Sequence, residues 1–524
     1  MKKTRERFTK REKSWILYDW ANSVYATNIM AAIFPIYFVA VAGESGDQWW
    51  GIGTSVATFA VALLAPLLGA VGDYRGMKKK LFAVFLAIGV VFTTAIAFTD
   101  QWQWMLAGYV LSRIGFTGSC LFYDSFLTDV TTPERMDKVS AWGYAMGYIG
   151  GSTIPFLISI AVLLIMGMNN PLAAKISVLI TSVWWAVFSI PMLKNVDQTH
   201  YVETPPRRLF SETFKSIGRT AKEIVKNRGL LLFALSYFFY IDGVGTVISV
   251  STAYGTTLGL GTVGMILALL VTQIVAVPFS VWFSKLAKRF STLKVIGSAI
   301  CVYVLICLVG FYMGFSLEPH AEQCEQALEQ ALEEVSPEAV GGGETYKAAY
   351  REYITNCINA VTSDDPAAKA AELTIEQTGL PQEQEAYIAA FAKNAVAEFF
   401  AEQSEALVAQ YRSAVSFSEL LFWAMAVLVG TVQGGIQAMS RSFFGKLIPP
   451  ERSNEFFGFF DIFGKFATVL GPLIYAGVSA ATGRSSWGVL GIGALFVLGG
   501  AILIAGRKDL KKIQPAGEAV EKED

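Results

Sequence analysis

The feature that most constrains this chain is a series of twelve apolar blocks, most of them about 20 residues long. A helix rises about 1.5 Å per residue, so about 20 residues cross the ~30 Å hydrocarbon core of a bilayer. Only 16% of the 524 residues are charged, against about 25% in soluble domains. The sequence therefore predicts an all-α membrane protein, with spans at residues 15–42, 50–72, 81–99, 104–126, 139–168, 170–193, 229–255, 260–284, 294–315, 415–445, 456–479 and 485–506.

Basic residues are concentrated in alternate loops, such as "YRGMKKK", "PERMDK" and "KLAKRFSTLK", whereas "GESGDQWW" and "TDQWQ" contain none. Short cytoplasmic loops carry the excess of Lys and Arg. We therefore expect a multi-pass protein of the cell (inner) membrane, with both termini and the 194–228 linker in the cytoplasm. The basic N-terminus precedes an apolar run too long for a signal peptide, which predicts a first span without cleavage.

One acidic segment interrupts the second half of the chain. Residues 316–413 hold 18 acidic and 5 basic residues, so we predict a helical insert on the extracytoplasmic side between the ninth and tenth spans. Cys324 and Cys357 lie within it and could form a disulfide if that compartment is oxidising. No Cys/His spacing in the chain indicates a metal site.

An internal repeat predicts how the spans are arranged. Residues 125–155 align without a gap with residues 442–472 at an offset of 317, and both contain Pro-Glu-Arg between the fourth and fifth span of their half. Halves in the same orientation form a parallel repeat with a site between them near the bilayer midplane. The predicted divisions are 1–193 (first six spans), 194–228 (linker), 229–315 (spans seven to nine), 316–414 (insert), 415–506 (last three spans) and 507–524 (tail).

The loop "GAVGDYRGMKKK" resembles the signature loop of the major facilitator superfamily, with Gly69, Asp73, Gly76 and Lys78 in place and Tyr74 departing from it. The resemblance implies a loop that latches the two halves on the cytoplasmic side. Asp73 would then face the first turn of span 11, whose free N–H groups favour an anion. The predicted gate residues are Gly69, Asp73, Arg75, Gly76, Glu134, Arg135, Glu451 and Arg452.

The Pro-Glu-Arg stretches also have a purely structural interpretation, which stays open. Proline suits the first position of a helix and an acidic residue stabilises its positive end. Pro133–Arg135 and Pro450–Arg452 would then only mark helix starts.

Four stretches narrow the resemblance: "LYDWANSVYATNIMAAIFPIYF", "LFYDSFLTDVTTPER", "YFFYIDGVGTVI" and "GGIQAMSRSFFGKLIPPERSNEFFGFFDIFGKFATVLGP". Together they resemble the autophagy-related vacuolar amino-acid effluxer family. That resemblance implies the twelve-helix major facilitator fold and secondary transport, with amino acids as the exported cargo.

Span 1 carries one polar face. Asp19, Asn22, Ser23 and Thr27 share a side at helical spacing, and intramembrane carboxylates usually face a cavity or a partner. We expect this face to line the translocation path, with Asp19 binding a proton or acting in gating. A structural role of Asp19 near the membrane surface is the alternative.

Further polar residues at membrane depth complete the predicted substrate and proton pathway. Arg113 in span 4 should have an acidic partner; Asp19 and Asp124 are candidates, although both lie toward the other side of the bilayer. The remaining pathway residues are Asp242 in span 7, Gln433 and Gln437 in span 10, and Asp461 and Lys465 in span 11, the last two spaced as an ion pair.

No phosphate-binding Gly-rich loop, nucleophile elbow or HExxH motif is present. We therefore expect no enzyme activity, no cofactor and no nucleic-acid partner. The prediction is a monomeric secondary transporter of a small polar metabolite, which works by alternating access and is coupled to protons. A lipid or lysolipid flippase is the first alternative, and a membrane scaffold or receptor acting through residues 316–414 is the second.

Overall fold

The structure is a computed structural model that describes residues 7–167, 170–203, 209–260, 262–335 and 405–513. In these ranges it is helical apart from one isolated bridge between Tyr74 and Val202. The elements are α1 (Lys10–Tyr25), the π-helix η1 (Ala26–Ala31), α2 (Ile33–Ala42), the 3-10 turn η2 (Gly43–Ser45), α3 (Gly46–Gly72), α4 (Met77–Ile96), α5 (Trp102–Ser125), α6 (Leu127–Val130), α7 (Pro133–Met146), the π-helix η3 (Gly147–Thr153), α8 (Ile154–Met166), α9 (Pro171–Asn195), α10 (Leu209–Lys226), α11 (Arg228–Thr257), α12 (Thr262–Phe290), α13 (Thr292–Val335), α17 (Glu405–Leu447), the 3-10 turn η4 (Pro450–Arg452), α18 (Ser453–Thr482) and α19 (Ser485–Ile513).

The described residues contain 12 helices or helix runs long and apolar enough to cross a membrane, as predicted. Four spans are composite: α1–η1–α2, α5–α6, α7–η3–α8 and η4–α18. Helices α13 and α17 run well past the predicted ends of their apolar blocks, to Val335 and from Glu405. The structure does not describe residues 336–404 or the side chain of Cys324. The predicted Cys324–Cys357 disulfide therefore lies outside the described residues.

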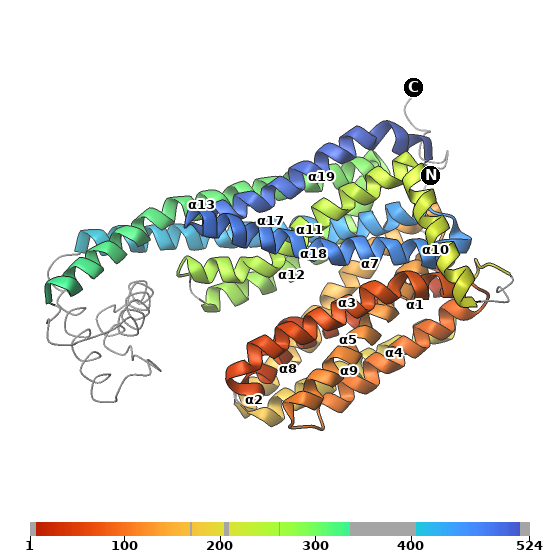
Figure 1. The fold of residues 1–524 in the computed structure, drawn as a ribbon, viewed down its shortest axis with the longest axis horizontal. Coiled ribbons are helices and arrows are strands. Elements are labelled where there is room, and N and C mark those ends of the chain that lie inside the picture. Colours follow the sequence, from red (N-terminus) through yellow and green to blue (C-terminus); the bar gives the residue numbers. More distant parts are fainter. Residues whose placement is uncertain (1–6, 168–169, 204–208, 261, 336–404, 514–524) are drawn as a thin grey trace.

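Each half has a hydrophobic core of its own. Trp15, Tyr25 and Trp185 are fully buried in the first half, whereas Tyr303 and Phe496 are fully buried and stacked in the second. Helices α1 to α9 form one bundle and α11 to α19 the other (Figure 1). This division matches the two six-span halves that the internal repeat predicts.

The two bundles meet at one end of the molecule. Both termini lie at this end, which we call the termini side, and the bundles diverge from it toward the opposite end (Figure 1). Helix α18 packs on α3, and α17 packs on α7. The approach is close at Gly458, where a Cβ would press on the carbonyl oxygen of Ala65.

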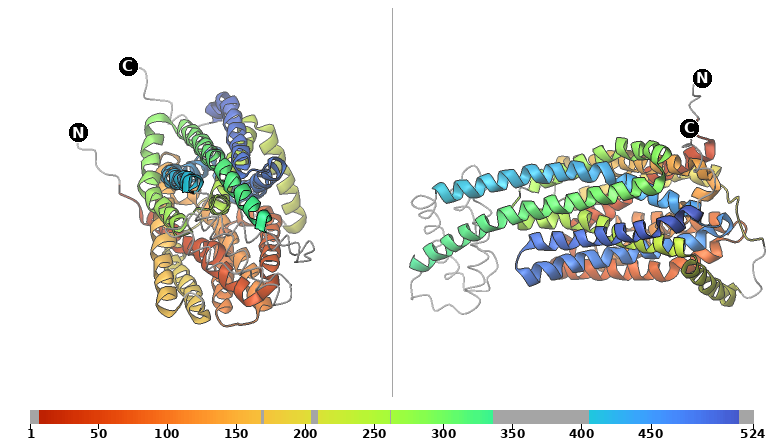
Figure 2. Two further views of the ribbon diagram at one scale, coloured as in Figure 1. Left: turned by 90° about the vertical axis from the view of Figure 1, so that its left-hand side faces the viewer. Right: turned by 90° about the horizontal axis from the view of Figure 1, so that it is seen from above.

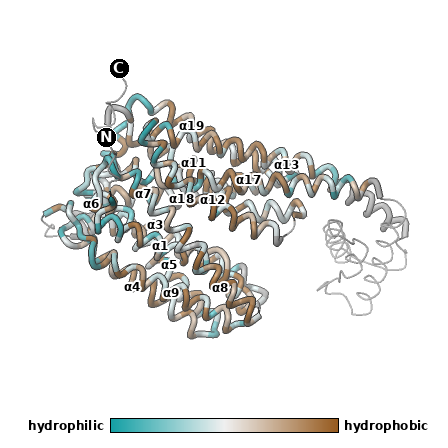
Figure 3. The backbone as a smooth tube through the Cα atoms, turned by 180° about the vertical axis from the view of Figure 1, so that it is seen from behind, coloured by the Kyte–Doolittle hydropathy of each residue, from teal (hydrophilic) through white to brown (hydrophobic). Residues whose placement is uncertain are grey.

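The outer surface of the bundles is apolar. Ile36, Phe98, Ile165 and Ile504 are each at least 73% exposed, which is normal for side chains that face lipid. Hydrophobic residues follow the spans, and hydrophilic residues gather at the termini side (Figure 3). This distribution places the polar contacts between the halves at the level where the spans end.

Candidate functional site

Arg441 of α17 is a buried charged group between the two halves, with only 4% of its side chain exposed. Its Nη1 lies 2.8 Å from Oδ1 of Asp124 in α5, and its Nη2 lies 3.3 Å from Oδ2 of Asp19 in α1. Its Nε donates to the Ser140 hydroxyl of α7. One guanidinium of the second half therefore holds three helices of the first half.

Aromatic rings enclose the same guanidinium. Its carbon lies 4.5 Å from the centre of the Tyr144 ring, 4.7 Å from Trp15 and 5.4 Å from Tyr123. Arginine suits such a place because its planar fork bonds carboxylates while its face stacks on rings. We call Arg441, Asp19, Asp124 and Ser140 with these rings the arginine cage.

The cage carries more acid than base. Asp19 and Asp124 both pair with Arg441, and Asp461 of α18 interacts electrostatically with Asp124. The side chain of Asp124 is 26% exposed, whereas that of Asp19 is 12% exposed. Asp124 is therefore the more exposed of the two carboxylates that bond Arg441.

Sequence reasoning missed Arg441, although the repeat contained the signal. At the offset of 317 that relates the halves, position 124 corresponds to position 441. Asp124 and Arg441 therefore occupy the same place in their respective halves, directly before Ser125 and Ser442, and bond to each other across the interface. The aligned stretch begins one residue later, at 125 and 442. Asp124 and Arg441 are different residue types, so a comparison that counts identical residues does not select them.

The polar face of α1 meets a glycine-rich face. A Cβ on Gly143 would touch the Asp19 carboxylate, and Cβ atoms on Gly147 and Gly151 would collide with Ser23. Thr27 donates to the Ser23 carbonyl oxygen. Part of the predicted path-lining face is therefore a packing surface between α1 and α7–η3.

Asn22 and Asp242 are buried without a charged partner among the described side chains. Nδ2 of Asn22 is buried without a hydrogen-bond partner in the described structure. Asp242 is fully buried in α11, where it accepts the Gly471 N–H at 2.9 Å and the Thr246 hydroxyl at 3.4 Å. Among the side chains that the structure describes, which do not include that of Lys465, no cation lies at ion-pair distance from Asp242.

Arg113 does not have the acidic partner that its place in span 4 predicts. Its guanidinium donates to the hydroxyls of Tyr109 and Thr58, and it forms no ion pair with a described residue. The expectation of an acidic partner was wrong. Two hydroxyls and the Tyr109 ring interact with the Arg113 guanidinium, whereas Asp19 and Asp124 pair with Arg441.

The remaining pathway residues lie on α17 and α18. Gln433 lines an apolar cavity of about 100 Å³ inside the second half, and Gln437 donates to the Gln433 carbonyl oxygen. Asp461 has an interaction partner. The structure does not describe the side chain of Lys465, so the ion pair between Lys465 and Asp461 stays a prediction.

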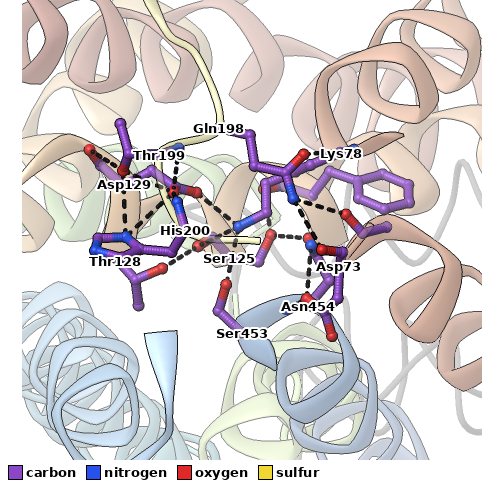
Figure 4. A network of polar contacts seen from close by, with 12 residues as sticks. Asp73, Lys78, Ser125, Thr128, Asp129, Gln198, Thr199, His200, Ser453 and Asn454 are labelled. Atoms are coloured by element: carbon purple, nitrogen blue, oxygen red, sulfur yellow. Dashed lines mark hydrogen bonds and ion pairs between the residues drawn. The ribbon is translucent and has the colours of Figure 1, made fainter. Parts of the chain in front are cut away.

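At the termini side, Asp73 of the first half contacts the first turn of α18 in the second half. We call this contact the first latch (Figure 4). The Asp73 carboxylate accepts the backbone N–H groups of Asn454 and Glu455 at 2.9 and 3.1 Å, in the first turn of α18. Burial raises the pKa of Asp73 to about 7, against the opposing effects of Lys78 and these N–H donors. Gly69 permits the approach, because a Cβ there would collide with the Asn454 carbonyl.

Lys78 and Asp129 extend the first latch to the linker. Their side chains are completely buried and 2.7 Å apart, and Lys78 also donates to Ser453 of α18 at 2.9 Å. Asp129 accepts the backbone N–H groups of Thr199 and His200. The hydrogen bond from the His200 ring to Asp129 raises the pKa of this histidine, while partial burial opposes the shift.

Asp137 of α7 forms a second latch beside the first. It accepts the hydroxyls of Ser442 and Thr292 at 2.6 and 2.8 Å and lies 2.8 Å from Nζ of Lys446. At the offset of 317, Asp137 corresponds to Asn454.

One hydrogen bond of the first latch repeats this pattern. The Ser125 hydroxyl donates to Asn454, and Ser125 corresponds to Ser442 at the same offset. The Ser442–Asp137 bond is therefore the repeat image of the Ser125–Asn454 bond. Sequence reasoning did not select Asp137, because its partners come from two segments far away in the chain, α13 and α17.

The two Pro-Glu-Arg arginines bind other segments at the termini side. Arg135 forms two 2.8 Å bonds to Glu12 at the start of α1, whereas Arg452 bonds Glu223 of α10 at 2.7 Å. Glu134 and Glu451 are exposed. The motif therefore both starts a helix and anchors a neighbouring one.

Arg75 and Gly76 shape the loop after α3. Arg75 pairs with Glu203 of the linker at the surface, 3.7 Å away. Gly76 adopts a left-handed φ of 71° directly before α4, a conformation that glycine tolerates without strain.

Comparison with known proteins gives one matching family model, described as vacuole effluxer Atg22 like, over residues 51–323 and 418–512. An uncharacterized MFS-type transporter of Bacillus subtilis, YxiO, is 37% identical over 511 residues, 95% of both chains. Autophagy-related protein 22-1 of Sclerotinia sclerotiorum is 23% identical over 70% of this chain, and the match spans about half (49%) of that relative.

Solved structures show the same fold at low identity. The proton:xylose symporter XylE, of the major facilitator superfamily, aligns with a TM-score of 0.54 at 10% identity, over 97% of this chain and 98% of that one. A bacterial homologue of the iron transporter ferroportin, in an outward-facing state, aligns with a TM-score of 0.54 at 12% identity, over 95% and 98%. The twelve spans therefore form the major facilitator fold.

Proposed function

The chain belongs to the Atg22-like vacuole effluxer family, and from that premise we propose that this major facilitator transporter exports amino acids by alternating access. The observation that carries the proposal is the arginine cage, where one buried cation and several carboxylates lie together between the halves. A zwitterion presents the complementary charges. Its carboxylate would exchange with Asp124 on Arg441, and its ammonium would take up the released carboxylate.

The arrangement of the interface supports alternating access. The halves touch at the termini side and diverge from it (Figure 1), and the described hydrogen bonds between them involve residues such as Asp73, Asp137 and Arg441 near that end. Closure at one end and separation at the other is one of the two states that such a cycle requires.

Exchange of labelled amino acids in proteoliposomes tests the role of the cage. We expect Arg441→Gln to lower exchange roughly tenfold to a hundredfold, because a hydrogen bond to a charged group contributes about 1.5–3 kcal/mol. Arg441→Lys should be intermediate, since a lysine cannot form the bidentate fork. Arg113→Gln is the control, because this arginine of the other bundle bonds Tyr109 and Thr58 and not the residues of the cage. Folded Arg441→Gln protein with wild-type exchange would refute the proposal.

We propose Asp242 as the proton carrier. A buried carboxylate without a cation favours its protonated form, and Asp242 has only N–H and hydroxyl contacts among the described residues. Asp242→Asn should make uptake insensitive to an imposed pH gradient while exchange at equal pH persists. Glu318→Gln is the control, because Glu318 is a buried carboxylate bonded to Ser485 and Ser486 at the opposite end.

The orientation that we propose places the termini side in the cytoplasm, on the strength of its Lys and Arg residues. A tag at residue 524 should then be cleaved by protease in inverted membrane vesicles and protected in right-side-out ones. The same vesicles discriminate the alternative functions. Movement of a fluorescent lysolipid would favour a flippase, and loss of all activity after deletion of 336–404 would favour a scaffold.

A further inference from the structure

Helix α10 lies across the ends of the spans at the termini side, outside both bundles (Figures 1 and 2). It packs on α3 and α11 as well as on the start of α18. The Ser216 hydroxyl donates to Glu455 at 3.1 Å, Arg452 bonds Glu223 at 2.7 Å, and Ile224 is buried. These residues define the inner face of α10.

The other face of α10 is basic. Lys215, Arg219, Lys222 and Lys226 are all exposed, and their spacing places them within about 60° of arc at 3.6 residues per turn. Arg219, Lys222 and Lys226 form no ion pair with another described residue. The acid in this part of the helix, Glu223, points to Arg452 instead. We call these four residues the basic face.

The membrane surface must lie close to this face. Lys226 comes two residues before Arg228, where a span begins, so the end of α10 is fixed at the level of the lipid headgroups. The inner face contacts Glu455, in the first turn of another spanning helix. Val225 is 64% exposed beside the cations, the kind of apolar side chain that enters the boundary between headgroups and acyl chains.

We propose that the basic face binds the headgroups of anionic phospholipids in the leaflet at the termini side. The charge is complementary, and the helix lies at headgroup depth with its cations turned away from the protein. The bound lipids also act on the transporter, because the Glu455 and Asn454 N–H groups that bond Asp73 belong to the turn on which α10 sits. Anionic lipid therefore stabilises the closed first latch.

Lipid retention by the full-length protein tests this proposal without any substrate. The protein is reconstituted in phosphatidylcholine with or without phosphatidylglycerol, and the retained phosphatidylglycerol is counted by native mass spectrometry. Each cation near an anionic surface contributes roughly a fivefold factor. The triple variant R219Q/K222Q/K226Q should therefore retain phosphatidylglycerol at least tenfold less, whereas R219K/K222R/K226R should retain it normally.

The matched control removes the same charge elsewhere on the termini side, in K285Q/K288Q/R289Q, whose side chains are also exposed. The proposal predicts that this control keeps its phosphatidylglycerol. Equal loss in both triple variants would show that only net charge matters and would overturn the proposal, as would unchanged retention in the α10 variant. Thermal stabilisation by phosphatidylglycerol should disappear only in the α10 variant, a result that holds whatever the cargo is.

Discussion

The two latches occupy repeat-related places but differ in chemistry. In the second latch, one carboxylate, Asp137, accepts two hydroxyls and one ammonium group. In the first, the corresponding position is the neutral Asn454, and the carboxylate is supplied by the loop at Asp73. The first latch also contains the buried Lys78–Asp129 pair and three linker residues, 198–200. Duplication preserved the backbone and one hydroxyl bond, whereas the charges were redistributed.

The two latches also differ in whether their contacts extend to the linker and α10. The hydrogen bonds of Asp137 in the second latch join α7 to α13 and α17. Those of the first run through the linker and α18 to α10. We therefore expect the first latch to respond to pH and to the linker, and the second to act as a fixed contact.

The largest effect should come from Lys78→Met. Removing the ammonium leaves Asp129 buried without its ion-pair partner, and breaking a buried pair costs about 3–5 kcal/mol. The measurement is the thermal midpoint of the purified protein together with labelling of a cysteine placed at Ser453. A change within experimental error would show that the first latch does not depend on this pair.

Asp137→Asn should have the next largest effect. The amide keeps the shape and one acceptor oxygen but removes the charge that balances Lys446, so we expect a loss of about 1.5–3 kcal/mol. The same thermal assay measures it. A loss greater than that of Lys78→Met would reverse the proposed ranking of the latches.

The repeat offers a matched pair of smaller changes, Ser442→Ala and Ser125→Ala. Each removes one hydroxyl from the same place in its half. The acceptor of Ser442 is a carboxylate and that of Ser125 is an amide, so the expected losses are about 1.5–3 and about 0.5–1.5 kcal/mol. Equal losses would mean that the charge of Asp137 does not strengthen its bond to Ser442.

The smallest effect should be that of His200→Gln, and it should depend on pH. Asp129 raises the pKa of His200 above its ordinary 6.5. The protonated ring therefore contributes stability fully below about pH 6.5, and this contribution is lost as the pH rises through the raised pKa. The difference in thermal midpoint between wild type and variant should shrink over that range. A constant difference from pH 5 to 9 would exclude the ring charge as its cause.

Much of the fold follows from the sequence alone. A run of apolar residues has few ways to satisfy its backbone in lipid, so block length predicts the spans. The repeat predicts the two halves, and Asp73 could be placed against α18 because a free helix N-terminus attracts an anion. These are local features or features of a regular pattern.

The arginine cage and the second latch could not be predicted in the same way. Arg441 meets Asp19, Asp124 and Ser140 from three helices, and span patterns do not show which faces of the helices meet. Arg113 illustrates the opposite error. The free-energy cost of burying an arginine in the membrane predicted a carboxylate partner for Arg113. The structure instead shows hydrogen bonds to two hydroxyls and a contact with the Tyr109 ring.

The linker is attached at both of its ends to different halves. Thr199 and His200 bond Asp129 of the first half, whereas Ser216 and Glu223 bond the start of α18 in the second. From Val202 to Leu209 the chain has seven steps, a contour length of roughly 25 Å at full extension. While both sets of hydrogen bonds hold, the length of this segment limits how far the two halves can separate at the termini side. A wider opening requires one of the two sets to break first.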